Sequence, residues 1–267
     1  MRNSPRLTLS VIVPVLNEGR TLAGILDRLL ALEEITEIVV VDDGSTDDTA
    51  TVAESYCGTT NTTPGAQRAP DSEPSYPSAA VEAASAADPA LPRVKLVKHD
   101  RNRGKGAAIR TGLLHVTGAV TVIQDGDLEY DPNDFKNMLD RIREGAGVVY
   151  GSRILGRNQF SYRRFLYGGK FLTLLANLLY GTSITDEPTC YKMARTDLYR
   201  RMNLECTGFE FCPEVTAKFA RLNERIVEIP IAYNPRSIEE GKKIRWTDGI
   251  IAIGTLLKYR FWRERRP

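Results

Sequence analysis

The first half of the chain alternates short apolar runs, rich in β-branched residues, with segments of helical spacing. Apolar runs of roughly 4–8 residues bounded by turn residues are typical of buried strands, whereas apolar positions three and four apart indicate helices. The expected strands are residues 9–15, 37–41, 94–97, 119–124 and 147–150, and the expected helices are 19–32 and 104–114, with another opening at Asp131 or Asn133. Ser45 or Thr46 is expected to cap a helix after the second strand, with Asp47 and Asp48 in its first turn. This alternation predicts an α/β fold with a mostly parallel twisted sheet flanked by helices.

The second half is less regular and more helical. Residues 165–180 form a mostly apolar helix, for which a core position is favoured over a lipid-facing one. Helices are also expected at 214–222 and 246–262, and a strand at 225–231. Residues 246–267 combine that last helix with an arginine-rich tail, which predicts contact with a membrane surface.

Residues 58–92 interrupt this organisation. The segment holds six prolines, many Ala, Ser and Thr residues, and a single aromatic residue, Tyr76. Such a composition buries too little apolar surface to offset the entropy of ordering. We expect a disordered insertion, dispensable for chemistry, within one domain that spans residues 1–267.

Composition excludes several classes of protein. The chain has 267 residues, 42% of them hydrophobic, and a formal net charge of +2, which does not indicate a nucleic-acid partner. Its four cysteines show no Cys-x-x-Cys spacing, which favours a reduced intracellular protein. No apolar run approaches the ~20 residues of a transmembrane helix.

Acidic side chains follow the fourth expected strand at alternate positions. Asp125, Asp127 and Glu129 come after the run Val-Thr-Val-Ile-Gln. On extended backbone they would share one face, and a carboxylate cluster suits a hard divalent cation that also binds phosphate oxygens. The alternative is a solvated acidic turn, which the motif alone does not exclude.

Two other strand ends carry polar groups, Asn17-Glu18 and Asp42-Asp43. Ligands of open α/β sheets bind outside the carboxyl ends of the strands, so these loops and the acidic loop are candidates for one site. Residues 102–107 (Asn-Arg-Gly-Lys-Gly-Ala) add a glycine-rich helix start with cations, which is not a Walker A loop. Close helix packing explains that segment equally well.

The second half also carries cations that suit an anion. They are Arg153, Arg163, Arg164, Lys192, Arg236, Lys242 and Lys243. Each by itself is typical of a solvated surface, but together they indicate a second anion besides one bound through a metal.

These motifs resemble the inverting family 2 glycosyltransferases of the GT-A fold. The resemblance lies in 13–18 (Val-Pro-Val-Leu-Asn-Glu), 41–47 (Val-Asp-Asp-Gly-Ser-Thr-Asp), 102–106 and Asp125-Gly126-Asp127. The segments 150–153, 185–192, 208–211 and 236–243 are similar to the polyprenyl-phosphate branch, which includes dolichyl-phosphate mannose synthase. The likeness covers nearly the whole chain except residues 58–92.

The resemblance implies a role for each matched position. Pro14, Asn17, Glu18, Asp42 and Asp125 would line the nucleotide pocket, and Arg236 and Lys242 would close over the donor. Asp125, Asp127 and Glu129 would hold Mg²⁺ or Mn²⁺; mannose synthases of this type often carry Gln where Glu129 stands. Arg153 and Arg164 would bind the acceptor phosphate and, with Asp127, form the catalytic set.

The implied reaction is metal-dependent transfer of a hexose from a nucleotide sugar to a polyprenyl phosphate. GDP-mannose is favoured as donor, with UDP-glucose next. The protein would act from the cytoplasmic face, peripherally or through an anchoring partner protein. Three alternatives remain open: a family 2 transferase with a hydroxyl acceptor, a dehalogenase-like phosphatase whose nucleophile loop is 41–46, and a non-catalytic nucleotide-sugar sensor.

Overall fold

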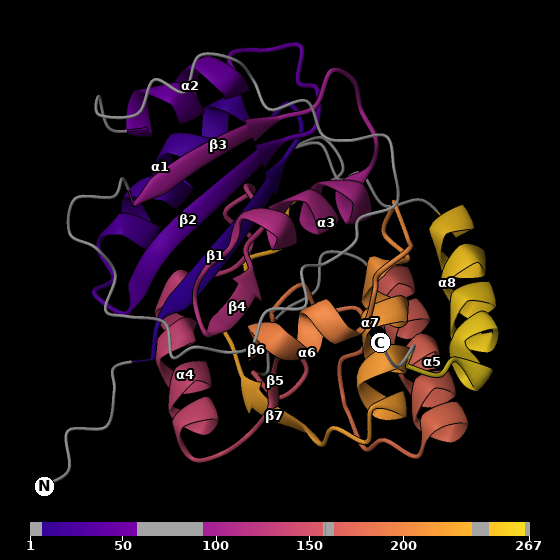
Figure 1. The fold of residues 1–267 in the computed structure, drawn as a ribbon. Helices are drawn as coiled ribbons and strands as arrows, with labels where there is room; N and C mark the ends of the chain where they lie inside the picture. The colour runs from indigo at the N-terminus through magenta and orange to yellow at the C-terminus, as the bar shows by residue number, and fades with distance from the viewer. Residues whose placement is uncertain (1–6, 58–92, 157, 159–162, 237–245, 265–267) are drawn as a thin grey trace, which may run out of the picture.

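A computed structural model describes residues 7–57, 93–156, 158, 163–236 and 246–264, without the side chains of Arg163 and Arg164. Its centre is a seven-stranded sheet of order β3-β2-β1-β4-β6-β5-β7 (Figure 1). The strands are β1 (Leu9–Val15), β2 (Ile35–Asp42), β3 (Val94–Lys98), β4 (Val120–Ile123), β5 (Val148–Ser152), β6 (Lys192–Arg195) and β7 (Ile226–Pro230). The α/β fold and the mostly parallel sheet are confirmed.

The sequence did not reveal β6. This strand pairs antiparallel with β4 and with β5, while β5 and β7 pair in parallel. It has four residues, Lys-Met-Ala-Arg, and charged residues at both ends conceal its apolar centre. The short helix α6 (Thr196–Arg201) follows directly.

Helices cover the sheet and form a group at one end of it (Figure 1). They are α1 (Gly19–Leu30), α2 (Thr49–Tyr56), α3 (Lys105–His115), α4 (Phe135–Arg143), α5 (Arg163–Tyr180), α7 (Phe211–Arg221) and α8 (Trp246–Lys258), with 3₁₀ turns at Pro132–Asp134 and Tyr259–Phe261. Helix α3 packs on β1 and β2, while α5, α7 and α8 pack on one another.

Two expectations about helices need correction. Helix α2 begins at Thr49, and neither Ser45 nor Thr46 caps it. The Ser45 hydroxyl instead accepts a hydrogen bond from the Asn17 amide, because the loop after β2 turns back toward β1. Helix α5 is only partly a core helix, since Tyr167, Leu174 and other apolar side chains on it are exposed.

The expected insertion at residues 58–92 lies outside the described residues, between α2 and β3. Among the helices that the structure describes, none has both the length and the apolar character needed to cross a membrane.

A buried carboxylate holds the edge of the sheet opposite the expected site. Glu37 accepts hydrogen bonds from the Ser10 hydroxyl at 2.5 Å, from Lys95 at 2.8 Å and from the Gly118 amide at 3.1 Å. Burial alone would raise its pKa, but these bonds and the Lys95 charge outweigh burial and lower it below the ordinary value. Glu37 therefore joins β1, β2, β3 and the loop before β4.

We expect Glu37→Gln to lower the free energy of unfolding by about 2 kcal/mol at pH 7, because it removes the charge and half of the acceptor capacity at a buried site. A group with a depressed pKa stabilises the fold above its unfolded pKa, and the gain is lost as pH falls through the folded value. Urea unfolding of the variant and the unchanged protein should therefore converge in acid.

The control is Glu54→Gln, which removes an ion pair with Lys98 at the surface. Exposed pairs contribute roughly 0–1 kcal/mol, so this variant should unfold nearly as the unchanged protein does. Equal losses in the two variants would contradict the role of Glu37.

Candidate active site

The carboxyl ends of β1 and β2 lie side by side, and their loops are tied together. Val15 is in register with Asp42. The Asp42 side chain accepts a hydrogen bond from the Ser45 amide at 3.0 Å, and the Asn17 side chain accepts one from the Thr46 amide at 2.8 Å. Asn17 has a positive φ of 53°, which asparagine tolerates better than most residues. The two predicted nucleotide-pocket residues thus shape the same loop.

The backbone after β4 departs from the sequence expectation. Extended structure ends at Ile123, and Leu128 adopts a positive φ of 61°. Asp125, Asp127 and Glu129 therefore do not alternate along a strand, because a turn at residues 126–127 lies among them. The Gly126 carbonyl accepts a 2.6 Å hydrogen bond from the Thr21 hydroxyl, which fixes this turn against α1.

Each of the three acids already has a partner. Lys105, the first residue of α3, lies 2.5 Å from an Asp125 oxygen. Burial would lower the pKa of Lys105, but the Asp125 charge raises it well above its ordinary value. The Glu129 carboxylate accepts hydrogen bonds from the Arg236 amide at 2.8 Å and from the Tyr233 hydroxyl at 3.1 Å.

Arg236 joins two acidic loops through its guanidinium group. One nitrogen lies 2.9 Å from an Asp127 oxygen, and both terminal nitrogens lie 3.2 Å from oxygens of Glu18. Three of the acidic residues predicted for the donor site, Glu18, Asp127 and Glu129, therefore contact one arginine, which the sequence also assigned to the donor.

The same gathering changes the acidity of Asp127. Burial, followed by the charges of Asp125 and Glu129, raises its pKa to about 6, although Arg236 opposes the shift. The described residues contain no ready-made group of three or more metal-ligating side chains. The chemistry of the donor set still fits a hard cation, because these carboxylates repel one another and a divalent ion would relieve that repulsion.

A second carboxylate at the end of β2 holds the glycine-rich loop. Asp43 accepts hydrogen bonds from the amides of Arg103 at 2.9 Å and Gly104 at 2.7 Å. Gly104 has a φ of 98°, and a Cβ there would lie 2.3 Å from the Thr207 carbonyl oxygen. Only glycine allows the loop to approach this closely.

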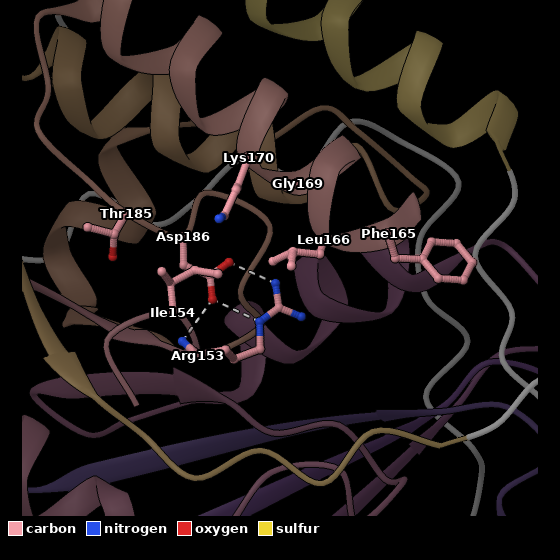
Figure 2. A pocket seen from close by; sticks show the side chains of 8 residues that line it. All are labelled: Arg153, Ile154, Phe165, Leu166, Gly169, Lys170, Thr185 and Asp186. Atoms are coloured by element: carbon pink, nitrogen blue, oxygen red, sulfur yellow. Dashed lines mark hydrogen bonds and ion pairs between the residues drawn. The ribbon is translucent and has the colours of Figure 1, made fainter. Parts of the chain in front are cut away.

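A cationic pocket lies beside the acidic loop. Arg153, just after β5, donates from Nε and Nη2 to the two oxygens of Asp186 at 2.8 Å each (Figure 2). The Asp186 and Thr185 amides in turn donate to the Glu228 carboxylate of β7, at 3.1 and 2.7 Å. Arg153 is thereby held in one orientation by a chain of two carboxylates.

Helix α5 supplies the other wall of this pocket. Figure 2 shows the Lys170 side chain directed toward Asp186, with Leu166 nearby. The lining residues are Arg153, Ile154, Phe165, Leu166, Gly169, Lys170, Thr185 and Asp186. Cationic and apolar groups therefore meet at the start of α5, a combination that suits an anion attached to an apolar chain.

Tyr233 connects the pocket to the acidic loop. Its hydroxyl donates to Glu129, and its ring lies under the Arg153 guanidinium, 5.1 Å from Cζ to the ring centroid. The carboxylate cluster and the cationic pocket are thus separated by a single aromatic side chain.

The structure brings most of the predicted site residues together, and several others lie outside the described residues. Asn17, Glu18, Asp42, Asp125, Asp127, Glu129, Arg153 and Arg236 gather at one side of the sheet, and Pro14 lies in β1 leading to it. Lys242, Lys243 and the side chains of Arg163 and Arg164 lie outside the described residues.

Lys192 does not belong with the predicted anion-binding cations. It is fully buried, its ammonium group donates to the Glu187 carbonyl at 2.6 Å, and it lies 3.8 Å from the centroid of the Tyr150 ring. A sequence pattern cannot distinguish such a buried lysine from a surface one.

The sequence analysis did not assign several residues of the candidate site. Lys105 lies in the glycine-rich segment, for which close helix packing was an equally good explanation, and Lys170 and Tyr233 belong to no motif. Their roles depend on contacts between segments far apart in the chain, which no local pattern records.

Comparison with known proteins identifies the family of the chain. The family description "Glycosyl transferase family 2" matches residues 10–67 and 71–202. The chain is 24% identical over 242 residues to a dolichol-phosphate mannosyltransferase of Pyrococcus furiosus, covering 88% of this chain and 59% of that protein. It is 28% identical over 239 residues to an undecaprenyl-phosphate 4-deoxy-4-formamido-L-arabinose transferase of Shewanella sediminis, covering 88% and 61%. It therefore spans about three fifths of these relatives.

Solved structures share the fold. Glucosyl-3-phosphoglycerate synthase of Mycobacterium tuberculosis superposes with a TM-score of 0.64 at 20% identity, over 95% of this chain and 80% of that one. The same enzyme in complex with Mn²⁺ and UDP-glucose gives a TM-score of 0.63. The family description matches most of the chain, and the solved structures share its fold, so the chain belongs to glycosyl transferase family 2.

Proposed function

We propose that the protein transfers a hexose from a nucleotide sugar to a polyprenyl phosphate, with inversion and with the help of a divalent metal. The observation that carries this proposal is the position of Tyr233 between the carboxylate cluster and the Arg153 pocket. A transferase for two phosphate-bearing substrates needs two adjacent anion sites, one of them served by a metal. The names of the two relatives support a polyprenyl-phosphate acceptor.

The donor half of the site is the loop set around Arg236. Asn17, Glu18 and Asp42 shape the nucleotide pocket, with Pro14 behind them, and Arg236 and Lys242 close over the donor. Asp125, Asp127 and Glu129 would hold Mg²⁺ or Mn²⁺, which when bound neutralises the diphosphate leaving group. GDP-mannose is the favoured donor, with UDP-glucose next.

The acceptor half is the pocket at the start of α5. A phosphate monoester has a second pKa near ~6, so it is mostly a dianion at neutral pH and attacks the anomeric carbon without a strong base. Its oxygen forms the new bond as the bond to the nucleoside diphosphate breaks on the opposite face. Arg153, Arg164 and Lys170 offset the repulsion between the two anions.

The second candidate function is transfer of the sugar to an acceptor with a hydroxyl group. We consider it because the chain shares its fold with glucosyl-3-phosphoglycerate synthase. Such an acceptor needs a general base. Asp186, a carboxylate of the acceptor pocket, is saturated by Arg153 and by the Arg153 amide, so it is poorly placed to take a proton.

The exposed face of the helix group supports a membrane location. On α5 the exposed apolar residues Tyr167, Phe171, Leu174 and Leu178 follow one another at intervals of four, three and four, so they share one face. The large apolar residues that are exposed on the packed neighbour α8 and on the turn after it are Trp246, Ile250, Ile251, Leu257 and Phe261. We propose that these residues contact the cytoplasmic face of a membrane, peripherally or beside an anchoring protein.

The direct test is a panel of donors with a short-chain polyprenyl phosphate and Mg²⁺ or Mn²⁺. Mass spectrometry of the lipid should show a hexosyl phosphate product with one donor. Sugar transfer only to hydroxyl acceptors would overturn the polyprenyl-phosphate assignment.

We expect Asp127→Asn to lower turnover by about 100-fold or more, because a neutral amide is a poorer ligand for a hard cation. Calorimetry with Mn²⁺ and UDP or GDP should show weaker metal binding, while circular dichroism stays unchanged. Asp140→Asn, at an exposed ion pair on α4, is the matched control. Unchanged metal binding by the Asp127 variant would refute the assignment.

We expect Arg164→Ala and Lys170→Ala each to raise the acceptor KM and lower kcat by roughly tenfold, since each charge opposes anion repulsion most in the transition state. Donor affinity, measured by calorimetry with metal present, should change little. Arg143→Ala, at the surface of α4, should behave as the unchanged protein does. Loss of donor binding with a normal acceptor KM would place these cations on the donor side.

We expect replacement of Phe171, Leu178 and Ile250 by serine to reduce flotation with vesicles of phosphatidylglycerol and phosphatidylcholine several-fold. These side chains are 55%, 74% and 60% exposed, so their loss should leave folding intact. Leu114→Ser, at an exposed apolar position on α3, is the control. Undiminished binding of the triple variant would exclude this face as the membrane contact.

A further inference from the structure

A buried histidine lies behind the glycine-rich loop. His99 follows β3, its Nδ1 lies 2.7 Å from an oxygen of Asp43, and its Nε2 lies 2.9 Å from the Thr111 hydroxyl of α3. Its backbone amide also donates to the Asp42 carbonyl at 2.8 Å. His99 is 6% exposed and is not among the residues that line the pocket beside Arg153.

The contact with Asp43 matters because that carboxylate has three N–H donors divided between its two oxygens. Oδ1 accepts hydrogen bonds from His99 Nδ1 and from the Arg103 amide, and Oδ2 accepts one from the Gly104 amide. A carboxylate only accepts when ionised, so the proton of this contact is on Nδ1. His99 thereby fixes the rotation of the carboxylate that binds both loop amides.

The loop has little room to adjust if this carboxylate turns. Cβ atoms added at Gly104 and Gly106 would lie 2.3 and 2.6 Å from the carbonyl oxygens of Thr207 and Cys206. The Ala107 amide also donates to the Thr207 carbonyl at 3.0 Å. A shift of the loop amides therefore moves the first residue of α3, Lys105.

Lys105 connects the glycine-rich loop to the proposed donor site. Its ammonium group lies 2.5 Å from Asp125, a proposed metal ligand, and 5.8 Å from the centroid of the Phe209 ring. We propose that His99 is a positioning residue for the donor site: through Asp43 and the amides of the glycine-rich loop, it sets the place of Lys105 beside Asp125. This inference rests on the proposed function.

Two substitutions separate the contacts of the imidazole. In His99→Asn, the side-chain amide reaches the place of Nδ1, so the donor to Asp43 is kept and the contact with Thr111 is lost. In His99→Gln, the amide reaches the place of Nε2, so the Thr111 contact is kept and Asp43 loses its donor. A role in packing alone would favour Gln, which fills more of the imidazole volume.

Hydrogen exchange of a peptide spanning residues 101–107 tests the structural step without any ligand. We expect faster exchange of the Arg103 and Gly104 amides in His99→Gln, and near-normal exchange in His99→Asn, because their acceptor stays in place. Equal exchange in both variants would overturn the proposal.

Calorimetry with Mn²⁺ and UDP or GDP tests the functional step. His99→Gln should weaken nucleotide binding by about tenfold and raise the Mn²⁺ requirement, with the acceptor KM unchanged. His99→Asn should remain within about threefold of the unchanged protein. Equal losses in the two variants would overturn the positioning role. If the unchanged protein binds neither nucleotide, the proposed function fails, and exchange then decides separately whether His99 holds the loop.

Discussion

The loops of both pockets depend on carboxylates that each accept hydrogen bonds from two consecutive backbone amides. These pairs are Asp43 with residues 103 and 104, Glu214 with 205 and 206, Glu210 with 207 and 208, and Glu228 with 185 and 186. Loop amides have no ladder partners, so a buried loop needs other acceptors, and charged acceptors form the stronger bonds. The geometry of the site is therefore set by acids that need not touch a substrate.

The charges within the site are also balanced by contacts between distant segments. Lys105 faces Asp125, and Arg236 faces Asp127 and Glu18. Under the proposed function, an incoming diphosphate with its metal offers the cations phosphate oxygens and offers the carboxylates a divalent ion. Each charged side chain of the site would then exchange its partner for another partner of the same charge sign. No charge has to be left buried and unpaired, and such a charge would be strongly destabilising.

Much of the fold and part of the site could be predicted from the sequence, for physical reasons. Runs such as Leu9–Val15 are mostly apolar because both faces of a parallel strand are buried, and polar residues mark the points where such runs end. The strand β6 could not be seen, because four residues with charged ends give no periodicity. The backbone at Leu128 was wrongly expected to be extended, since a positive φ at a leucine is set by tertiary contacts rather than by propensity. Lys192 was wrongly placed among surface cations, because its burial depends on tertiary packing: its ammonium group lies over the ring of Tyr150, which belongs to β5.

Under the proposed function, helix α5 serves both ends of an amphiphilic acceptor. Its apolar content predicted burial, yet the residues at 167, 171, 174 and 178 face outward while Ala176 is buried. Near its start, Leu166 and Lys170 line the pocket that holds Arg153, so the anion-binding end of the helix adjoins its apolar stripe. A lipid phosphate has the same order of groups, a charged head followed by an apolar chain. A small soluble phosphate would use the pocket but would have no use for the exposed stripe, and the stripe therefore favours the lipid as the acceptor.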